Sequence, residues 1–154
     1  MKSKSLLTQL AAVFLAALTV YVLAYQGIEW RRVRSGPWRL SFIRDAAGAP
    51  AVLINQPMLG ITNVLILFPG ETFPVPTNSG TVLALEQPQP VPFAVPFGRC
   101  VFMDATSLPG TLAFELFGHE IQLLPRVLTI DKAEQPWRSE ARLSLTPAPG
   151  RRQN

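Results

Sequence analysis

The stretch TLAFELFGHEIQLLPRV, from Thr111 to Val127, predicts a β-hairpin and with it the fold class of the chain. Runs of alternating apolar and polar residues flank the pair Gly118-His119, and glycine is favoured at the first central position of a type II′ turn. The register that follows places Leu116 opposite Ile121. One face of the hairpin is then apolar and the other polar, as a half-solvated antiparallel sheet requires.

His119 is the single histidine of the chain, and Glu120 follows it directly, so this pair is the strongest candidate for catalysis. In the predicted turn the imidazole lies at an exposed tip without a buried acid to orient it, whereas a general base needs a positioned partner. The sequence contains no G-x-S-x-G, H-E-x-x-H, phosphate-loop or dinucleotide-binding motif. We therefore interpret both residues as turn residues, expect no enzymatic activity, and expect His119→Asn to leave the fold intact.

Candidate strands recur at short intervals along the rest of the chain. They are WRLSFIR, AVLIN, ITNVLILF, TVLALE, CVFMD, RVLTID and ARLSLT, in addition to the two strands of the hairpin. After Pro37 no window carries an apolar stripe of helical period, and turn residues separate the runs. The sequence predicts an all-β domain, an antiparallel β-sandwich or small barrel of roughly eight or nine strands.

The segment EQPQPVPFAVPFG, Glu86 to Gly98, has prolines at nearly alternate positions. Proline lacks the backbone N–H that a central strand donates, so within sheets it is confined mainly to edges and irregular positions. We expect this segment to form an extended crossing or a protected sheet edge.

An uncharged apolar run, LLTQLAAVFLAALTVYVLAY from Leu6 to Tyr25, predicts one N-terminal transmembrane helix. Its length matches the roughly 20 residues that a helix needs to cross a bilayer. Aromatic and arginine side chains gather at its far end, where amphipathic rings settle at the level of the lipid headgroups. The expected membrane-interface residues are Tyr21, Tyr25, Trp30, Arg31, Arg32 and Arg34.

Two alternatives to an uncleaved signal anchor remain open at the level of sequence. Val22-Leu23-Ala24 has the small-residue pattern of a signal-peptide cleavage site, which predicts secretion after cleavage near Ala24. Basic residues flank both ends of the apolar run, so a cytoplasmic domain is the second alternative. We prefer a single-pass membrane protein with an extracytoplasmic domain, because a short basic tail is the part least easily translocated.

The expected organisation has five parts along the chain. They are a basic N-terminal tail (1–5), a transmembrane signal-anchor helix (6–25), a basic juxtamembrane link (26–36), a β-sandwich domain (37–146) and a disordered basic tail (147–154). Residues 6–25 are expected to contact the lipid bilayer.

The net charge of +4 arises largely next to the apolar run and in the C-terminal tail. Such a distribution indicates membrane flanks and a basic tail, so no nucleic-acid partner is expected. Cys100 is the single cysteine, and metal-binding spacings of the CxxC and HxxxH types are absent. We expect neither a metal nor another cofactor, and we interpret Cys100 as a small buried apolar residue.

Two stretches provide candidates for ligand or partner binding. NQPMLGITN contains Asn55 at a turn, and EQPWRSEARL places Trp137 beside Arg138. A tryptophan next to an arginine can anchor a partner protein or a sugar ring, although tryptophan near a strand more often packs at the margin of the core.

An anchor, a small β domain and the lack of a catalytic motif together favour a non-enzymatic module. We expect it to bind a protein partner of unknown identity, or to act as an accessory subunit of a membrane or envelope complex. The alternatives are a small membrane-tethered hydrolase that uses His119 and Glu120, and a domain that binds a glycan or another small ligand.

Overall fold

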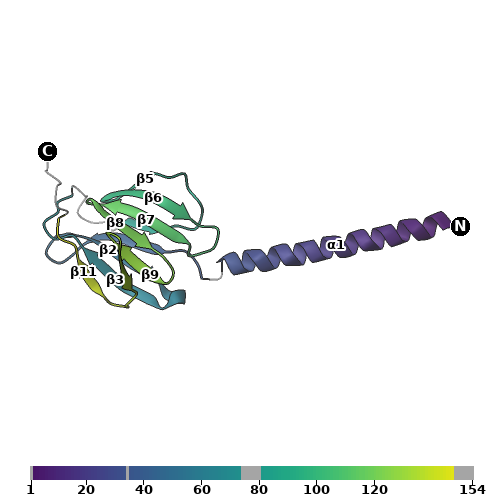
Figure 1. The fold of residues 1–154 in the computed structure, drawn as a ribbon, viewed down its shortest axis with the longest axis horizontal. Coiled ribbons are helices and arrows are strands. Elements are labelled where there is room, and N and C mark those ends of the chain that lie inside the picture. Colours follow the sequence, from purple (N-terminus) through teal and green to yellow (C-terminus); the bar gives the residue numbers. More distant parts are fainter. Residues whose placement is uncertain (1, 34, 74–80, 148–154) are drawn as a thin grey trace. The chain divides into compact units, whose positions relative to one another are not determined.

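A computed structural model describes residues 2–33, 35–73 and 81–147, and the chain divides into two units, of which the first is a single helix (Figure 1). This helix, α1, runs from Lys2 to Val33 and thus continues past Tyr25 through most of the segment 26–36. Large apolar side chains are exposed along it on all sides. Its segment Leu6–Arg31 is long and apolar enough to cross a membrane.

The second unit begins at Ser35 and contains two β-sheets; we call it the two-sheet domain (Figure 1). The first sheet has the order β11-β3-β2-β1-β4, formed by β1 Arg39–Arg44, β2 Pro50–Gln56, β3 Ile61–Leu67, β4 Thr81–Ala84 and β11 Arg142–Ser144. The second has the order β10-β9-β8-β7-β6-β5, formed by β5 Phe93–Val95, β6 Gly98–Asp104, β7 Thr111–Leu116, β8 His119–Leu123, β9 Val127–Ile130 and β10 Ala133–Pro136. A short 3-10 turn, η1 (Pro57–Leu59), joins β2 to β3.

The prediction of a mostly β domain after one N-terminal apolar helix is confirmed, and each predicted strand overlaps an observed one. Strands β5 and β10 were not predicted. β5 is the edge strand of its sheet, which agrees with the edge expected for the proline-rich segment.

The predicted antiparallel pairing is found in eight of the nine strand pairs that the structure describes, and it is wrong for one, because β11 pairs with β3 in parallel. The short connection 137–141 carries the chain from the second sheet to the first. It delivers β11 to the end of the domain where β3 begins, so both strands run in the same direction.

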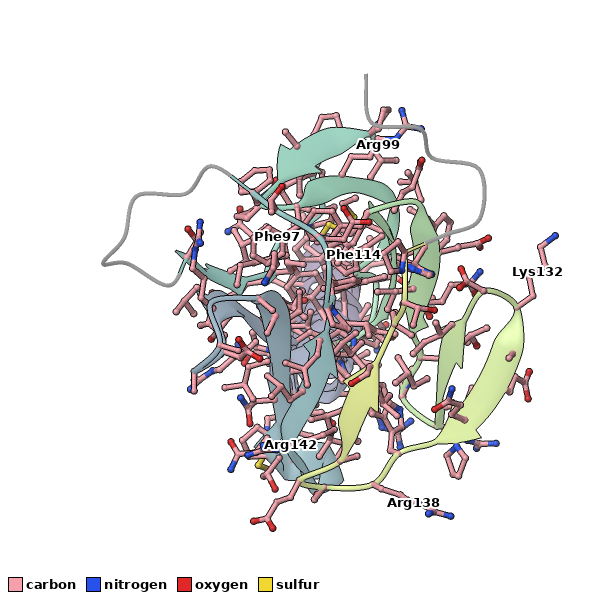
Figure 2. All side chains as sticks on the ribbon, turned by 90° about the vertical axis from the view of Figure 1, so that its left-hand side faces the viewer. Phe97, Arg99, Phe114, Lys132, Arg138 and Arg142 are labelled. Carbon is pink, nitrogen blue, oxygen red and sulfur yellow. The ribbon has the colours of Figure 1, made fainter. Side chains whose placement is uncertain are left out.

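One apolar core lies between the two sheets, and both sheets contribute to it. Figure 2 shows Phe114 within this mass of side chains, whereas Lys132 projects from a hairpin at the periphery. Trp38 is fully buried, and its indole N–H donates a hydrogen bond of 3.1 Å to the carbonyl of Gly110. A buried tryptophan thus has a partner for its one polar group, which removes the cost of desolvating that group.

The hairpin of β7 and β8 forms one residue earlier than predicted. Phe117 and Gly118 occupy the turn with φ of 50° and 84°, and Leu116 pairs with His119. The predicted apolar face is confirmed; its buried residues are Phe114, Leu116, Ile121 and Leu123. The predicted turn pair is wrong, and His119 becomes the first residue of β8 on the buried face.

Phe117 adopts an unfavourable backbone conformation because its ring completes an aromatic cluster, formed by Phe68, Phe73, Phe97 and Phe117. Its ring centroid lies 5.1 Å from that of Phe68, 5.4 Å from that of Phe97 and 6.4 Å from that of Phe73. A left-handed conformation costs a bulky residue about 1–2 kcal/mol. Burial of the ring contributes about 1.5–3 kcal/mol, and each aromatic pair adds about 0.5–1.5 kcal/mol, so packing outweighs the backbone term.

Candidate functional site

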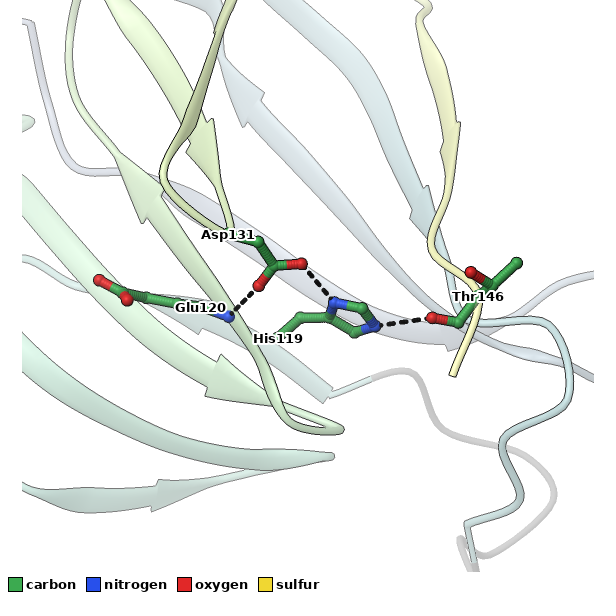
Figure 3. A network of polar contacts seen from close by, with 4 residues as sticks. All are labelled: His119, Glu120, Asp131 and Thr146. Carbon is green, nitrogen blue, oxygen red and sulfur yellow. Dashed lines mark hydrogen bonds and ion pairs between the residues drawn. The ribbon is translucent and has the colours of Figure 1, made fainter. Parts of the chain in front are cut away.

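His119 is the buried member of a polar network at the start of β8 (Figure 3). Its Nδ1 lies 2.6 Å from Oδ2 of Asp131, and its Nε2 lies 3.0 Å from the carbonyl oxygen of Thr146. The second oxygen of Asp131 accepts a hydrogen bond of 2.9 Å from the backbone N–H of Glu120. His119 is only 6% exposed, so the prediction of a histidine at an exposed tip without an orienting acid is wrong.

Two acceptor oxygens face the imidazole, one on each ring nitrogen. A carboxylate and a backbone carbonyl can only accept hydrogen bonds, so only a ring with a proton on each nitrogen donates to both. Burial by itself would raise the pKa of Asp131; the hydrogen bonds from His119 and from the Glu120 N–H, together with the charge of His119, outweigh burial and lower that pKa. The contact joins a buried imidazole to a half-exposed carboxylate, and it is an ion pair when both ring nitrogens carry protons.

The candidate catalytic pair His119 and Glu120 does not converge on one site. Successive side chains of a strand point to opposite faces, and Figure 3 shows Glu120 directed away from the imidazole. The Glu120 carboxylate instead accepts a hydrogen bond from the side chain of Gln122. A general base needs a ring nitrogen that faces its substrate, but Nε2 faces the carbonyl of Thr146.

A groove of about 550 Å³ lies between β10 and β11, and two of the predicted binding residues line it. β10 ends one sheet and β11 ends the other, so within the described residues neither strand pairs with another strand on its outer side. The buried side chains of Val64 and Leu128 contribute an apolar base, together with the half-buried Leu143. The polar and aromatic part of the rim consists of Glu134, Gln135, Trp137, Arg138, Ser139, Glu140 and Arg142.

Trp137 forms part of the groove wall and is fixed by the core behind it. Its ring lies 5.3 Å from that of Trp38, and its indole N–H donates a hydrogen bond of 2.8 Å to the carbonyl of Leu124. Arg138, the next residue, is exposed and projects from the ribbon in Figure 2. The structure thus places Trp137 at the margin of the core and Arg138 at the solvent-exposed rim.

Asn55 lies outside the residues that line the groove. Its Oδ1 accepts a hydrogen bond of 2.8 Å from the backbone N–H of Asn63, which has a φ of 53°. The pairing of β2 with β3 shifts register at this point. Asn55 therefore satisfies the backbone of a β-bulge, a common role of asparagine near turns.

Gln56 has a structural role that was not predicted from the sequence. It is 1% exposed, and its Nε2 donates to the carbonyl oxygens of Gly36 at 2.9 Å and Pro37 at 3.1 Å. Its Oε1 accepts a hydrogen bond of 3.1 Å from the N–H of Met58. Glutamine is usually exposed, so no local pattern in the sequence indicates that this side chain is buried.

Cys100 is buried, as predicted. Burial raises the pKa of its thiol, which donates a hydrogen bond to the carbonyl of Phe102. In the described ranges, no group of three histidine, cysteine or acidic side chains is arranged to hold a metal ion.

The predicted membrane-interface residues lie at or near the C-terminal part of α1. The rings of Tyr21 and Tyr25 stack with centroids 6.5 Å apart, and Trp30 and Arg31 are exposed. Arg32 also belongs to α1, whereas Arg34 lies outside the described residues.

No known protein family, curated protein or solved structure matches this chain. The groove, the histidine network and the apolar helix are therefore the features from which a function is inferred.

Proposed function

We propose that this protein is a non-enzymatic, membrane-anchored β-sandwich module whose groove between β10 and β11 binds an extended segment of a protein partner. The observation that carries the proposal is the groove itself, in which two edge strands border an apolar base. An extended peptide can add to such an edge through backbone hydrogen bonds while its apolar side chains enter the groove.

Strand β11 has backbone groups available for this mode of binding. The carbonyl of Ala141 and the N–H of Leu145 bond to β3. Backbone groups of a parallel strand alternate in direction, so those of Arg142 and Ser144 point away from β3, toward the open edge. These groups match the backbone of an added strand.

The charged side chains of the rim favour a partner segment that carries both positive and negative charges. Arg138 and Arg142 supply positive charge, and Glu134 and Glu140 supply negative charge, all on exposed side chains. Charges at the rim of an interface mainly affect partner choice and association rate, whereas the apolar base supplies burial.

The anchor belongs to the same proposal. The segment Leu6–Arg31 has 26 residues, and a helix of that length spans about 39 Å, more than the roughly 30 Å hydrocarbon core of a bilayer. A helix that is apolar on all sides is stable in lipid rather than in water. We propose a single-pass protein with an extracytoplasmic domain; a cytoplasmic domain and secretion after cleavage near Ala24 are the alternatives.

A reporter enzyme that is active only outside the cytoplasm, fused to the C-terminus of the full chain, distinguishes these topologies. We expect reporter activity in the membrane fraction. Activity in the culture medium would indicate cleavage, and an expressed but inactive fusion would indicate a cytoplasmic domain.

The alternative functions have less support from the contacts of the candidate residues. A hydrolase built on His119 and Glu120 needs two groups that face one substrate, and these side chains lie on opposite faces of β8. A glycan-binding platform needs an aromatic face open to the sugar, whereas the ring of Trp137 packs against Trp38.

Purification of the tagged full-length chain from its native membrane in mild detergent tests the groove. We expect a stoichiometric partner with the wild-type chain, and about tenfold less of it, equivalent to about 1.4 kcal/mol, with the double variant Arg138→Glu and Arg142→Glu. The matched control is Arg39→Glu, which reverses the charge of an exposed arginine outside the groove.

The outcomes separate the groove from other surfaces. Equal loss of partner in the groove variant and in Arg39→Glu would show that the partner does not bind in the groove. A wild-type chain that purifies alone and as a monomer would remove the proposal of a protein partner.

A further inference from the structure

We infer that the turn η1 contacts the membrane surface and inserts Met58 and Leu59 at the boundary between lipid headgroups and acyl chains. This inference rests on the proposed membrane anchor and adds a second contact with lipid, made by the two-sheet domain.

The tip of η1 exposes two adjacent apolar side chains. Met58 is 70% exposed and Leu59 is 37% exposed. Among the described residues of the two-sheet domain, most other large apolar side chains are buried or half-buried. The exposed ones, Val82, Val91 and Phe102, are separate residues in β4, the proline-rich segment and β6. Single exposed apolar residues are common, but an adjacent pair at the tip of a turn is a candidate contact surface.

The hydrogen bonds of Gln56 hold η1 beside the point where the chain enters the domain. The amide of Gln56 bonds to the carbonyls of Gly36 and Pro37, and its oxygen bonds to the N–H of Met58. Gly36 follows Val33, the last residue of α1, by three residues. Three residues reach at most about 10 Å, so the covalent chain limits how far this end of the domain can lie from the end of the helix.

The turn is fixed and does not need to refold to meet a surface. The N–H of Gly60, which has a φ of 71°, donates a hydrogen bond of 3.0 Å to the carbonyl of Pro57. The hydroxyl of Ser139 donates to the carbonyl of Gly60 at 2.6 Å and accepts from the N–H of Thr62 at 3.2 Å. Because these backbone groups have partners, little conformational entropy remains to be lost on binding.

A lipid surface fits this tip better than a protein groove would. Apolar side chains on a fixed polar scaffold can enter the headgroup boundary to a depth of about 5–10 Å, as those of interfacial helices do. Met58 has a flexible thioether side chain that adapts to a fluid environment. The short link to a membrane-spanning helix keeps the tip at high local concentration near the bilayer.

Depth-dependent quenching in the full chain tests the contact. An environment-sensitive fluorophore is attached to Met58→Cys or, as the matched control, to Ala47→Cys. Ala47 is exposed in the turn between β1 and β2, at the other end of a strand that spans about 20 Å from the Pro37 end. Cys100 is fully buried, and the wild-type chain treated with the same reagent measures any labelling of it.

The labelled proteins are reconstituted into vesicles of phosphatidylcholine and phosphatidylglycerol that contain a lipid with a nitroxide at a shallow acyl position. We expect a blue-shifted emission at position 58 and quenching about twofold or more stronger than at position 47. Each sample is also washed with alkaline carbonate, which removes proteins that do not span the bilayer.

Three results would overturn the inference. Equal quenching at both positions in chains that resist carbonate would exclude the tip contact and leave the anchor in place. A blue shift at position 58 without quenching would show contact with protein, such as a second copy of the chain, instead of lipid. Release of the chain by carbonate would contradict both the anchor and the tip contact.

Discussion

Replacing Phe117 with alanine is expected to lower the free energy of unfolding of the two-sheet domain by about 3–5 kcal/mol, as for other large-to-small core substitutions. The ring is 5% exposed and contacts three other members of the aromatic cluster. Its removal leaves a cavity that the rigid neighbouring rings cannot fill. Urea unfolding of the full chain in detergent, followed by tryptophan fluorescence, measures this loss.

Phe117→Gly is the matched variant that separates packing from backbone strain. At a φ of 50° glycine has no steric penalty, whereas alanine does. We therefore expect Phe117→Gly to be more stable than Phe117→Ala by about 1 kcal/mol, although glycine is normally the less stable residue in β structure. The opposite order would contradict a left-handed conformation at position 117, and a loss below about 1 kcal/mol in Phe117→Ala would contradict its packing role.

The predicted hairpin turn is wrong by one residue because a local sequence pattern does not account for tertiary packing. Sequence preference places glycine, not phenylalanine, at positive φ, so the pattern FGHE favoured Gly118-His119 over Phe117-Gly118. The observed turn depends on rings of Phe68, Phe73 and Phe97, which are distant in sequence. Tertiary packing thus decided between two turns that differ by one residue.

The strands that were predicted and those that were not differ in their packing. Strands such as β3 and β7 bury much of their surface, so their apolar content indicates them directly. β10 has the sequence AEQP and is largely exposed, so it has no apolar alternation. Its formation depends on pairing with β9 through a turn at Asp131 and Lys132, which have φ of 49° and 69°.

The same unpredicted hairpin explains why the histidine network was missed. The pairing of β8 with β9 places Ile121 opposite Ile130, and so brings the turn residue Asp131 next to the start of β8. Without β10, no local pattern places Asp131 in a tight turn. The groove was not predicted either, because it lies between the edges of two sheets. Two of its lining residues, Trp137 and Arg138, were nevertheless candidates for binding.

Replacing His119 with alanine is expected to destabilise the domain by about 2–3 kcal/mol, because it removes a buried ring together with its contacts to the Asp131 carboxylate and the Thr146 carbonyl. The sequence-based expectation that His119→Asn leaves the fold intact assumed that His119 lies in an exposed turn. That assumption is wrong, because the side chain is buried. Denaturant unfolding of the full chain in detergent at neutral pH provides the measurement. A loss below about 0.5 kcal/mol, typical of surface substitutions, would contradict a structural role of the network.

A double-mutant cycle with Asp131→Ala isolates the ion pair from the other contacts of each residue. Asp131 also accepts the N–H of Glu120, so Asp131→Ala has a cost of its own. We expect the double variant to lose less stability than the sum of the single variants, with a coupling of about 1–2 kcal/mol for a pair that is half-exposed on one side. Additive losses would show that His119 and Asp131 act independently.

The lowered pKa of Asp131 gives the pair a defined dependence on pH. Burial opposes the lowering, and the hydrogen bonds from His119 and the Glu120 N–H with the charge of His119 outweigh it. A carboxyl whose folded pKa is lowered stabilises the fold above its unfolded pKa and loses that contribution as pH falls through the folded value. The stability difference between wild type and Asp131→Asn should therefore be present at about pH 5 and shrink below about pH 4, as the Asp131 carboxyl takes up a proton. A difference that persists unchanged into strong acid would mean that the charge of the Asp131 carboxylate does not stabilise the fold.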